Sequence, residues 1–209
     1  CSEQTKRRPR QTGVYVKSSH DFPEATRYLP SRRAAAVERG SPCSKSKLAE
    51  LLEPKSLTVV NANDPMPTNA DGSMMMHPNS DLFYLSGIEQ EESILLLFPD
   101  AADPKHREIL FLREPNEHLQ IWEGYKHSKA DARKISGISN VQWLSEFPVL
   151  FRILMCEAES AYLNSNEHKR AGDEVETREL RFISKCRHDF PLHELRRLAP
   201  LLHQLRIVK

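Results

Sequence analysis

The hydrophobic pattern divides the chain into a polar start and a longer segment with regular apolar runs. Residues 1–45 contain few large apolar side chains and many Lys, Arg, Ser and Pro residues, including the basic run at residues 6–10. Such a composition buries too little apolar surface to offset the entropy lost on ordering the chain. We therefore expect a flexible or loosely docked arm over residues 1–45 and one folded domain over residues 46–209.

The first half of the folded segment predicts a short helix, a long loop and a series of strands. Leucines at helical spacing precede Pro54, and the apolar run 57–60 follows it, which indicates a helix that ends at proline and leads into a strand. Turn-forming residues dominate residues 61–80 and predict a loop. Three β-favouring runs then predict strands of an antiparallel meander, at residues 82–85, 93–98 and 108–112.

Helical periodicity dominates the second half. It predicts helices at residues 128–135, 144–157 and 176–190, with brief strands at residues 141–143 and 161–163. Leu192, Leu195 and Leu198 extend the last helical stripe until Pro200 interrupts it. Because strands dominate the first half and helices alternate with strands in the second half, the sequence predicts a mixed α/β domain.

Composition limits the possible partners. The formal net charge of +1, from 30 Lys and Arg against 29 Asp and Glu, provides no chain-wide field that would attract nucleic acid or an anionic membrane. We interpret the basic run at residues 6–10 as a solvated tail, with nucleic-acid contact as the weaker alternative. No apolar run reaches the roughly 20 residues of a membrane span, and the four separated cysteines form no CxxC pair. We expect a cytoplasmic protein without nucleic-acid or membrane partners.

A search for catalytic motifs finds no HExxH, GxSxG, Walker loop or GxGxxG. Three carboxylates around the long loop, Asp64, Asp71 and Asp81, could hold Mg²⁺ or Mn²⁺. Aspartates in such loops more often hydrogen-bond their own backbone, and we expect no metal site. Cys156 and Cys186 lie on predicted apolar helix faces, where we expect buried, inert thiols.

Trp122 stands out among the remaining residues. It lies in a glycine-containing turn, residues 121–126, together with Gly124 and Tyr125. A large aromatic side chain on a turn is either half-buried packing or an anchor for a partner surface. The spacing favours neither interpretation.

Several separated motifs resemble the N-terminal domain of the aminopeptidase P family. Residues 79–88, NSDLFYLSGI, resemble the family signature NSDFxYLTG, and residues 121–124, IWEG, resemble its (I/V)WxG turn. The matching signature residues are Asn79, Ser80, Asp81, Tyr84 and Gly87. Residues 91–98 and 108–111 resemble the next two strands of the family, and residues 199–209 resemble the segment that leads into a peptidase domain. The similarity spans about residues 46–209.

The resemblance implies a ribonuclease-H-like α/β fold, with a mixed sheet flanked by helices, in a two-domain Xaa-Pro aminopeptidase. A second domain, missing beyond Lys209, would hold two Mn²⁺ ions and hydrolyse the bond before proline. The present chain would then be non-catalytic and hold no cofactor. In bacterial members the tryptophan matching Trp122 reaches toward a neighbouring subunit's active site. Trp122, Gly124 and Tyr125 would thus form a subunit contact that limits the access of proline-containing peptides, in a homodimer or homotetramer.

The chain departs from the family pattern at residues 74–78, where MMMHP replaces an aromatic-containing segment and a basic residue followed by Gln. Residues 1–45 also match the family poorly. The resemblance also allows an alternative, because related N-terminal domains occur in proteins whose peptidase half has lost its metals: a peptide- or protein-binding module of such a pseudo-peptidase. Another is a nuclease, which rests on the fold analogy and on Asp64, Asp71 and Asp81 alone.

Overall fold

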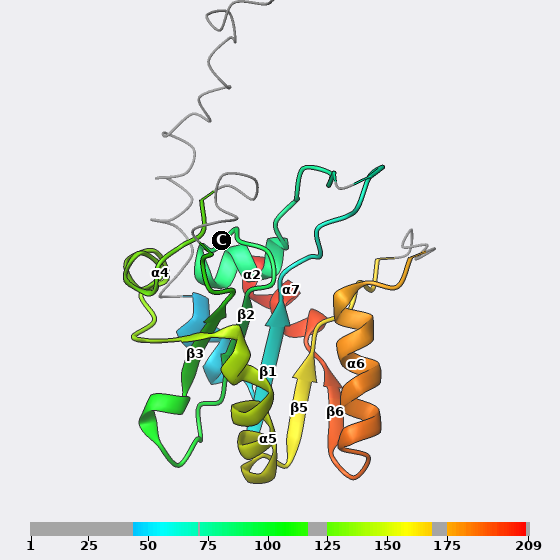
Figure 1. The fold of residues 1–209 in the computed structure, drawn as a ribbon. Coiled ribbons are helices and arrows are strands. Elements are labelled where there is room, and N and C mark those ends of the chain that lie inside the picture. The colour runs from blue at the N-terminus through cyan, green and yellow to red at the C-terminus, as the bar shows by residue number, and fades with distance from the viewer. Residues whose placement is uncertain (1–43, 71, 117–124, 169–174, 208–209) are drawn as a thin grey trace, which may run out of the picture.

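In a computed structural model, residues 44–70, 72–116, 125–168 and 175–207 are described. They form a six-stranded sheet with helices on both faces (Figure 1). The strand order is β4-β3-β2-β1-β5-β6. The strands are β1 Ser56–Asn61, β2 Ile94–Leu97, β3 Glu108–Leu112, β4 Asn140–Trp143, β5 Ser160–Leu163 and β6 Glu194–Arg197.

The sheet combines an antiparallel meander with parallel additions on both sides. β1 pairs antiparallel with β2, and β2 pairs antiparallel with β3. β5 lies parallel to β1, β6 lies parallel to β5, and β4 lies parallel to β3. Every residue of β1, β2 and β5 is buried, because helices cover both faces, and this explains why these strands read as continuous apolar runs.

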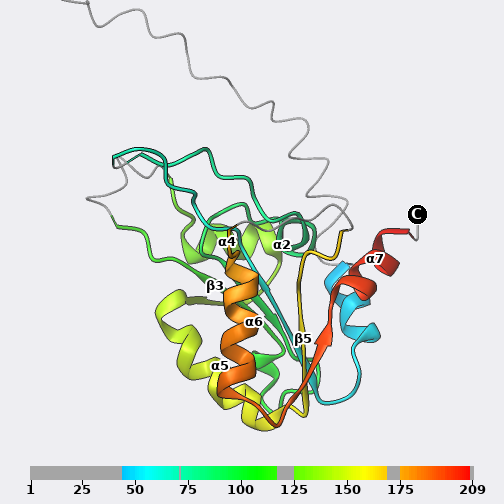
Figure 2. The same ribbon diagram turned by 90° about the vertical axis from the view of Figure 1, so that its right-hand side faces the viewer.

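Within the described ranges, seven helical elements surround the sheet, besides a helical segment at residues 44–51. The α-helices are α2 Ser80–Ser86, α4 Lys129–Ser136, α5 Phe147–Glu157, α6 Arg178–Asp189 and α7 Ala199–Ile207; the 3₁₀-helices are η1 Pro104–His106 and η2 Leu144–Glu146. Viewed along the sheet, α5 and α6 cover one face, and α7 and the helix at residues 44–51 cover the other (Figure 2). α2 and α4 lie on the same side as α7, because their buried side chains belong to the same core cluster.

Two hydrophobic cores follow from this layering. Between the sheet and α5 and α6, Phe147, Phe151 and Phe182 pack against one another with ring centroids 5.2–5.9 Å apart. On the opposite face, Leu82, Leu85 and Leu202 pack against the other side of the same strands. The inner strands β1, β2 and β5 are therefore buried on both sides, which gives the domain a rigid base for the loops at its strand ends.

The predicted strand at residues 82–85 is wrong, because these residues form helix α2. The side chain of Asn79 accepts hydrogen bonds from the backbone N–H groups of Asp81 and Leu82, and Gly87 ends the helix at φ 70°. These two caps provide hydrogen-bond partners for free backbone groups at both ends of the helix, although the residues between them favour strands. The first strand of the antiparallel meander is β1 instead.

The predicted helical stripe through Leu192, Leu195 and Leu198 is also wrong. Residues 194–197 form β6, an edge strand that carries Glu194, Arg196 and Arg197. Pro200 does not interrupt a helix either, because it lies in the first turn of α7, where a missing N–H costs nothing.

The other sequence-based elements are confirmed. The helices predicted at residues 128–135, 144–157 and 176–190 correspond to α4, to η2 with α5, and to α6. The predicted strands at residues 57–60, 93–98, 108–112, 141–143 and 161–163 correspond to β1 to β5. The mixed α/β fold class, a mixed sheet flanked by helices, is thereby confirmed. No helix in the described ranges is long and apolar enough to cross a bilayer.

Candidate functional site

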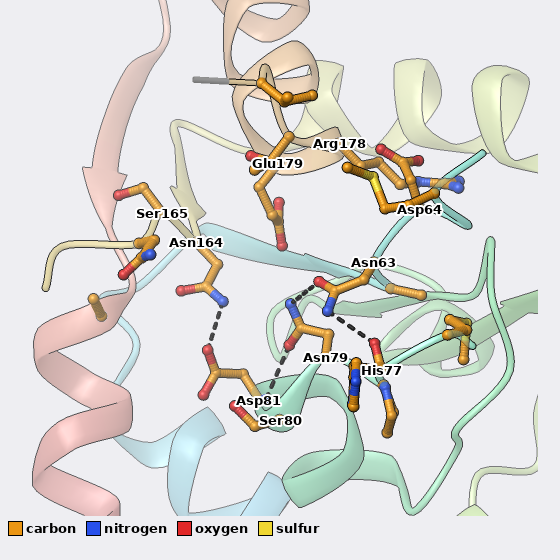
Figure 3. Close-up of a pocket in the computed structure, with 18 of the residues that line it drawn as sticks. Asn63, Asp64, His77, Asn79, Ser80, Asp81, Asn164, Ser165, Arg178 and Glu179 are labelled. Carbon is orange, nitrogen blue, oxygen red and sulfur yellow. Dashed lines mark hydrogen bonds between the residues drawn. The ribbon is translucent and has the colours of Figure 1, made fainter. Parts of the chain in front are cut away.

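A cavity of about 710 Å³ opens at the carboxyl ends of the parallel strands β1 and β5. Loops outside the carboxyl ends of parallel strands are the usual place for ligand sites in open α/β sheets. The wall is formed by residues directly after β1 and β5, by the loop that precedes α2, by the start of α6 and by α7. Figure 3 shows Glu179 and Asn164 directed into this space from above, with Asp81 opposite them.

Glu179 is the most unusual group in this cavity. It lies in the first turn of α6 with 9% of its surface exposed, and its two carboxylate oxygens accept hydrogen bonds from the backbone N and from Nδ2 of Asn61, at 2.9 and 2.8 Å. Burial raises the pKa of Glu179 to about 7, while the Asn61 hydrogen bonds lower it and the charge of Asp81 raises it further. The side chain therefore exchanges a proton near neutral pH.

The start of α6 is fixed independently of Glu179. The hydroxyl of Thr177 accepts a hydrogen bond from the N–H of Leu180 and caps the helix. One turn later, Arg181 forms an ion pair with Asp64 at 2.6 Å and donates to the backbone carbonyl of Glu176. The loop after β1 is thereby attached to α6.

The signature residues at 79–87 gather at the opposite wall. Asn79, Ser80 and Asp81 line the cavity. Asp81 accepts a hydrogen bond from Nδ2 of Asn164 at 2.8 Å and forms an ion pair with Arg206 of α7 at 2.5 Å. These residues therefore connect α2, the end of β5 and α7.

Tyr84 lies in α2 and Gly87 at its C-terminal cap, and both lie against neighbouring helices. The guanidinium of Arg206 lies 5.1 Å from the centre of the Tyr84 ring. At Gly87 an added Cβ would lie 3.2 Å from Cγ2 of Ile135 in α4, in a backbone conformation of φ +70°. The positive φ favours glycine at this helix end, and a Cβ there would also force the Ile135 side chain to shift by a few tenths of an ångström.

Of the expected contact site around Trp122, only Tyr125 falls within the described residues; Trp122 and Gly124 lie outside them. Tyr125 is 66% exposed, and its hydroxyl donates to Oδ2 of Asp131 at 2.7 Å. The hydrogen bond to the carboxylate raises the pKa of Tyr125. The exposed ring agrees with an anchor position, but whether it contacts a subunit stays a prediction.

The described residues on either side of residues 117–124 are attached to one segment, residues 90–92. On the N-terminal side, Arg113 lies 3.4 Å from the carboxylate of Glu92. On the C-terminal side, Lys126 forms an ion pair with Glu91, and the backbone N of His127 donates to Oε1 of Gln90 at 2.7 Å.

Two of the three carboxylates considered for a metal site form ion pairs with arginines. Asp64 pairs with Arg181 and Asp81 pairs with Arg206, while Asp71 lies outside the described residues. Within the described ranges, no three His, Cys, Asp or Glu side chains come close enough together to hold a metal ion. The residues described here do not fit a pair of Mn²⁺ ions, and the nuclease interpretation gains no support from them.

The prediction of two buried thiols is half wrong. Cys186 is fully buried in the core beneath α6, and burial raises the pKa of its thiol to about 12. Cys156 is exposed, because the face of α5 that meets the sheet carries Phe147, Phe151 and Leu154.

Sequence reasoning missed Glu179, Asn61 and Asn164. A signal for Glu179 was present, since it shares a helical face with Phe182 and Cys186, both buried. A carboxylate on such a face needs a partner. Asn61 and Asn164 stand at the polar ends of two apolar strand runs, but their proximity depends on the parallel pairing of β1 and β5.

Comparisons with known proteins agree with this architecture. The family model described as the N-terminal domain of aminopeptidase P matches residues 44–163. Xaa-Pro aminopeptidase 3 of Mus musculus is 24% identical over 153 residues, which are 72% of this chain and 30% of that protein. A solved structure of a candidate aminopeptidase P from Bacillus anthracis aligns with a TM-score of 0.69 at 26% identity, over 80% of this chain and 39% of that one.

The aminopeptidase P of Escherichia coli has the same fold, with a TM-score of 0.63 at 20% identity over 84% of this chain. In each comparison this chain spans well under half of the relative, at 30% of the mouse protein and 39% of each solved structure. The similarity therefore concerns one part of longer proteins.

Proposed function

Because the chain belongs to the aminopeptidase P N-terminal domain family, we propose that it is the non-catalytic N-terminal part of a Xaa-Pro aminopeptidase. A following domain would hold two Mn²⁺ ions, which activate water for attack on the bond before proline. The residues described here supply neither metal ligands nor a nucleophile to that reaction. Their contribution is assembly of subunits and control of access to the active site, in a cytoplasmic homo-oligomer that acts on proline-containing peptides.

The observation that supports an access role is that the described residues on both sides of residues 117–124 are anchored. Arg113 pairs with Glu92 and Lys126 pairs with Glu91, and the ring of Tyr125 next to Lys126 is exposed. Fixed ends reduce the entropy that a loop loses when its tip contacts a partner. An aromatic side chain on such a loop suits a contact with a neighbouring subunit.

A substitution in the turn tests this role in the chain joined to its peptidase domain. Trp122→Ala should shift the protein to smaller species in sedimentation velocity. It should also raise the rate at which long Xaa-Pro peptides are hydrolysed relative to a tripeptide, because loss of the indole widens the entrance to the active site. Trp143→Phe serves as the control, since it alters the other indole of the chain. Unchanged association and unchanged length preference for Trp122→Ala would refute the access role.

One observation favours a second function, a peptide- or protein-binding module without catalysis. Four of the five methionines line the cavity, and Met66, Met74 and Met75 are 44%, 58% and 86% exposed. Flexible thioether side chains adapt to varied apolar partners. Saturable binding of fluorescent proline-containing peptides to the isolated chain, lost in Met74→Ser with Met75→Ser, would support this function; absence of binding would exclude it for such peptides.

A further inference from the structure

Arg206, near the end of α7, contacts three residues of one turn of α2. Its guanidinium pairs with the carboxylate of Asp81 at 2.5 Å, donates to the backbone carbonyl of Ser80 at 3.2 Å and lies over the ring of Tyr84 at 5.1 Å. An arginine can serve all three partners at once, because its planar guanidinium carries several donors and also stacks on aromatic rings.

The partners of Arg206 are also held by contacts that do not involve α7. Asn164, which is 5% exposed, donates to the second oxygen of Asp81. Asn79 caps the helix that carries Ser80, Asp81 and Tyr84. Little conformational freedom remains to be lost when the guanidinium binds, so the site is preorganised.

The rest of α7 is attached differently. At its start, the backbone N of Leu198 donates to the carbonyl of Leu163 at 3.0 Å. In the middle, Leu202 is buried in the core cluster that contains Leu82 and Leu85. This apolar face sets which side of α7 meets the sheet, and the contacts of Arg206 add directional interactions near the last turn of the helix.

We propose that Arg206, together with Ser80, Asp81 and Tyr84, forms a latch that fixes the direction in which α7 leaves the domain. These are positioning residues, because they act on the orientation of the chain that follows α7. The proposal explains why three residues of the NSDLFYLSG signature lie together without forming a catalytic site. That the following chain is a peptidase domain rests on the proposed function, whereas the latch itself is a property of the residues described here.

Distance measurement between two spin labels tests the latch in the chain alone. One label is attached to Cys156, which is exposed, and the other to Ile207→Cys at the end of α7, in a background with Cys1→Ser and Cys43→Ser. The parent should give a narrow distance distribution by pulsed electron spin resonance. Asp81→Asn and Arg206→Gln should each broaden it, and the double variant should broaden it no further than Arg206→Gln alone, because that substitution already removes the ion pair with Asp81.

Hydrogen exchange provides a second measurement on the same variants. Amides of α7 should exchange about fivefold faster in Arg206→Gln, which matches the loss of a partly exposed ion pair and a cation–π contact, and faster by a smaller factor in Asp81→Asn, which removes only the ion pair. Arg206→Lys should restore part of the protection, because it keeps the charge and loses the planar guanidinium. Arg197→Gln, which removes the ion pair with Glu167, is the matched control and should leave both measurements unchanged.

Two outcomes overturn the latch: narrow parent-like distances in both single variants, or broadening in Arg197→Gln equal to theirs. Neither measurement involves a peptidase domain or a substrate. Refutation of the latch would therefore not affect the proposed function. Absence of Xaa-Pro cleavage by the protein would likewise not affect the latch.

Discussion

Glu179 accepts hydrogen bonds from both the backbone and the side-chain amide of Asn61, at 2.9 and 2.8 Å. The pair joins the first turn of α6 to the last residue of the central strand, at the edge of the cavity. A buried carboxyl with a pKa of about 7 thus lies where the sheet, α6 and the cavity meet. Its protonation state affects both the stability of the domain and the charge of the cavity.

We predict that Glu179→Gln removes a pH dependence of stability. The pKa of Glu179 is raised from 4.5 to about 7 in the folded state, so this group favours the folded state below pH 4.5, and the benefit is lost as the pH rises through 7. Relative to the wild type, Glu179→Gln should gain at most about 3 kcal/mol in free energy of unfolding between pH 4.5 and 8.

Urea denaturation at several pH values measures that difference. Glu176→Gln is the control, because Glu176 lines the same cavity but is exposed. Parallel profiles of unfolding free energy against pH for the wild type and Glu179→Gln would contradict the prediction, because they would show that Glu179 has the same pKa in the folded and unfolded states.

Asn79→Ala should destabilise the domain by about 1 kcal/mol, the usual cost of losing a helix cap. The Asn79 side chain accepts from the N–H groups of Asp81 and Leu82, and both donors lose this partner in the variant. Thermal or urea unfolding measures the loss. Asn166→Ala, whose side chain accepts from His168 in an exposed loop, should change stability much less, and equal losses in both variants would argue against the capping role.

The two described cysteines should differ sharply in reactivity. Cys156 is exposed, whereas Cys186 is buried with its thiol pKa raised to about 12, and only the thiolate is nucleophilic. Iodoacetamide followed by mass spectrometry should modify Cys156 in the native protein and Cys186 only after unfolding. Equally fast modification of Cys186 would mean that the core beneath α6 opens readily.

Much of the fold followed from the sequence, and the failures have local causes. Residues 82–85 read as a strand because Leu, Phe and Tyr favour strands, yet Asn79 and Gly87 cap both ends of a helix there. Both caps were visible in the sequence. Residues 194–197 carry three charged side chains. Such side chains suit a solvent-facing edge strand, but the segment then lacks the alternation of apolar and polar residues that predicts a strand.

The site was harder to predict than the fold. The NSDLFYLSG signature was found from its residues, but its contact with Arg206 joins positions 125 residues apart, counted from Asp81 to Arg206. Asn61 pairs with Glu179 and Asn164 pairs with Asp81, and these two pairs flank one cavity because β1 and β5 are neighbours in the sheet. Such contacts arise from strand order, which local periodicity does not determine.

Cleavage of a Xaa-Pro tripeptide tests the central claim most directly. The chain alone and the chain extended by the residues that follow it in its gene are compared with and without Mn²⁺. We predict Mn²⁺-dependent release of the residue before proline by the extended protein and none by the chain alone. Cleavage by the chain alone, or an extended protein that binds no Mn²⁺ and cleaves nothing, would contradict the proposal that this domain serves a Xaa-Pro aminopeptidase without performing its chemistry.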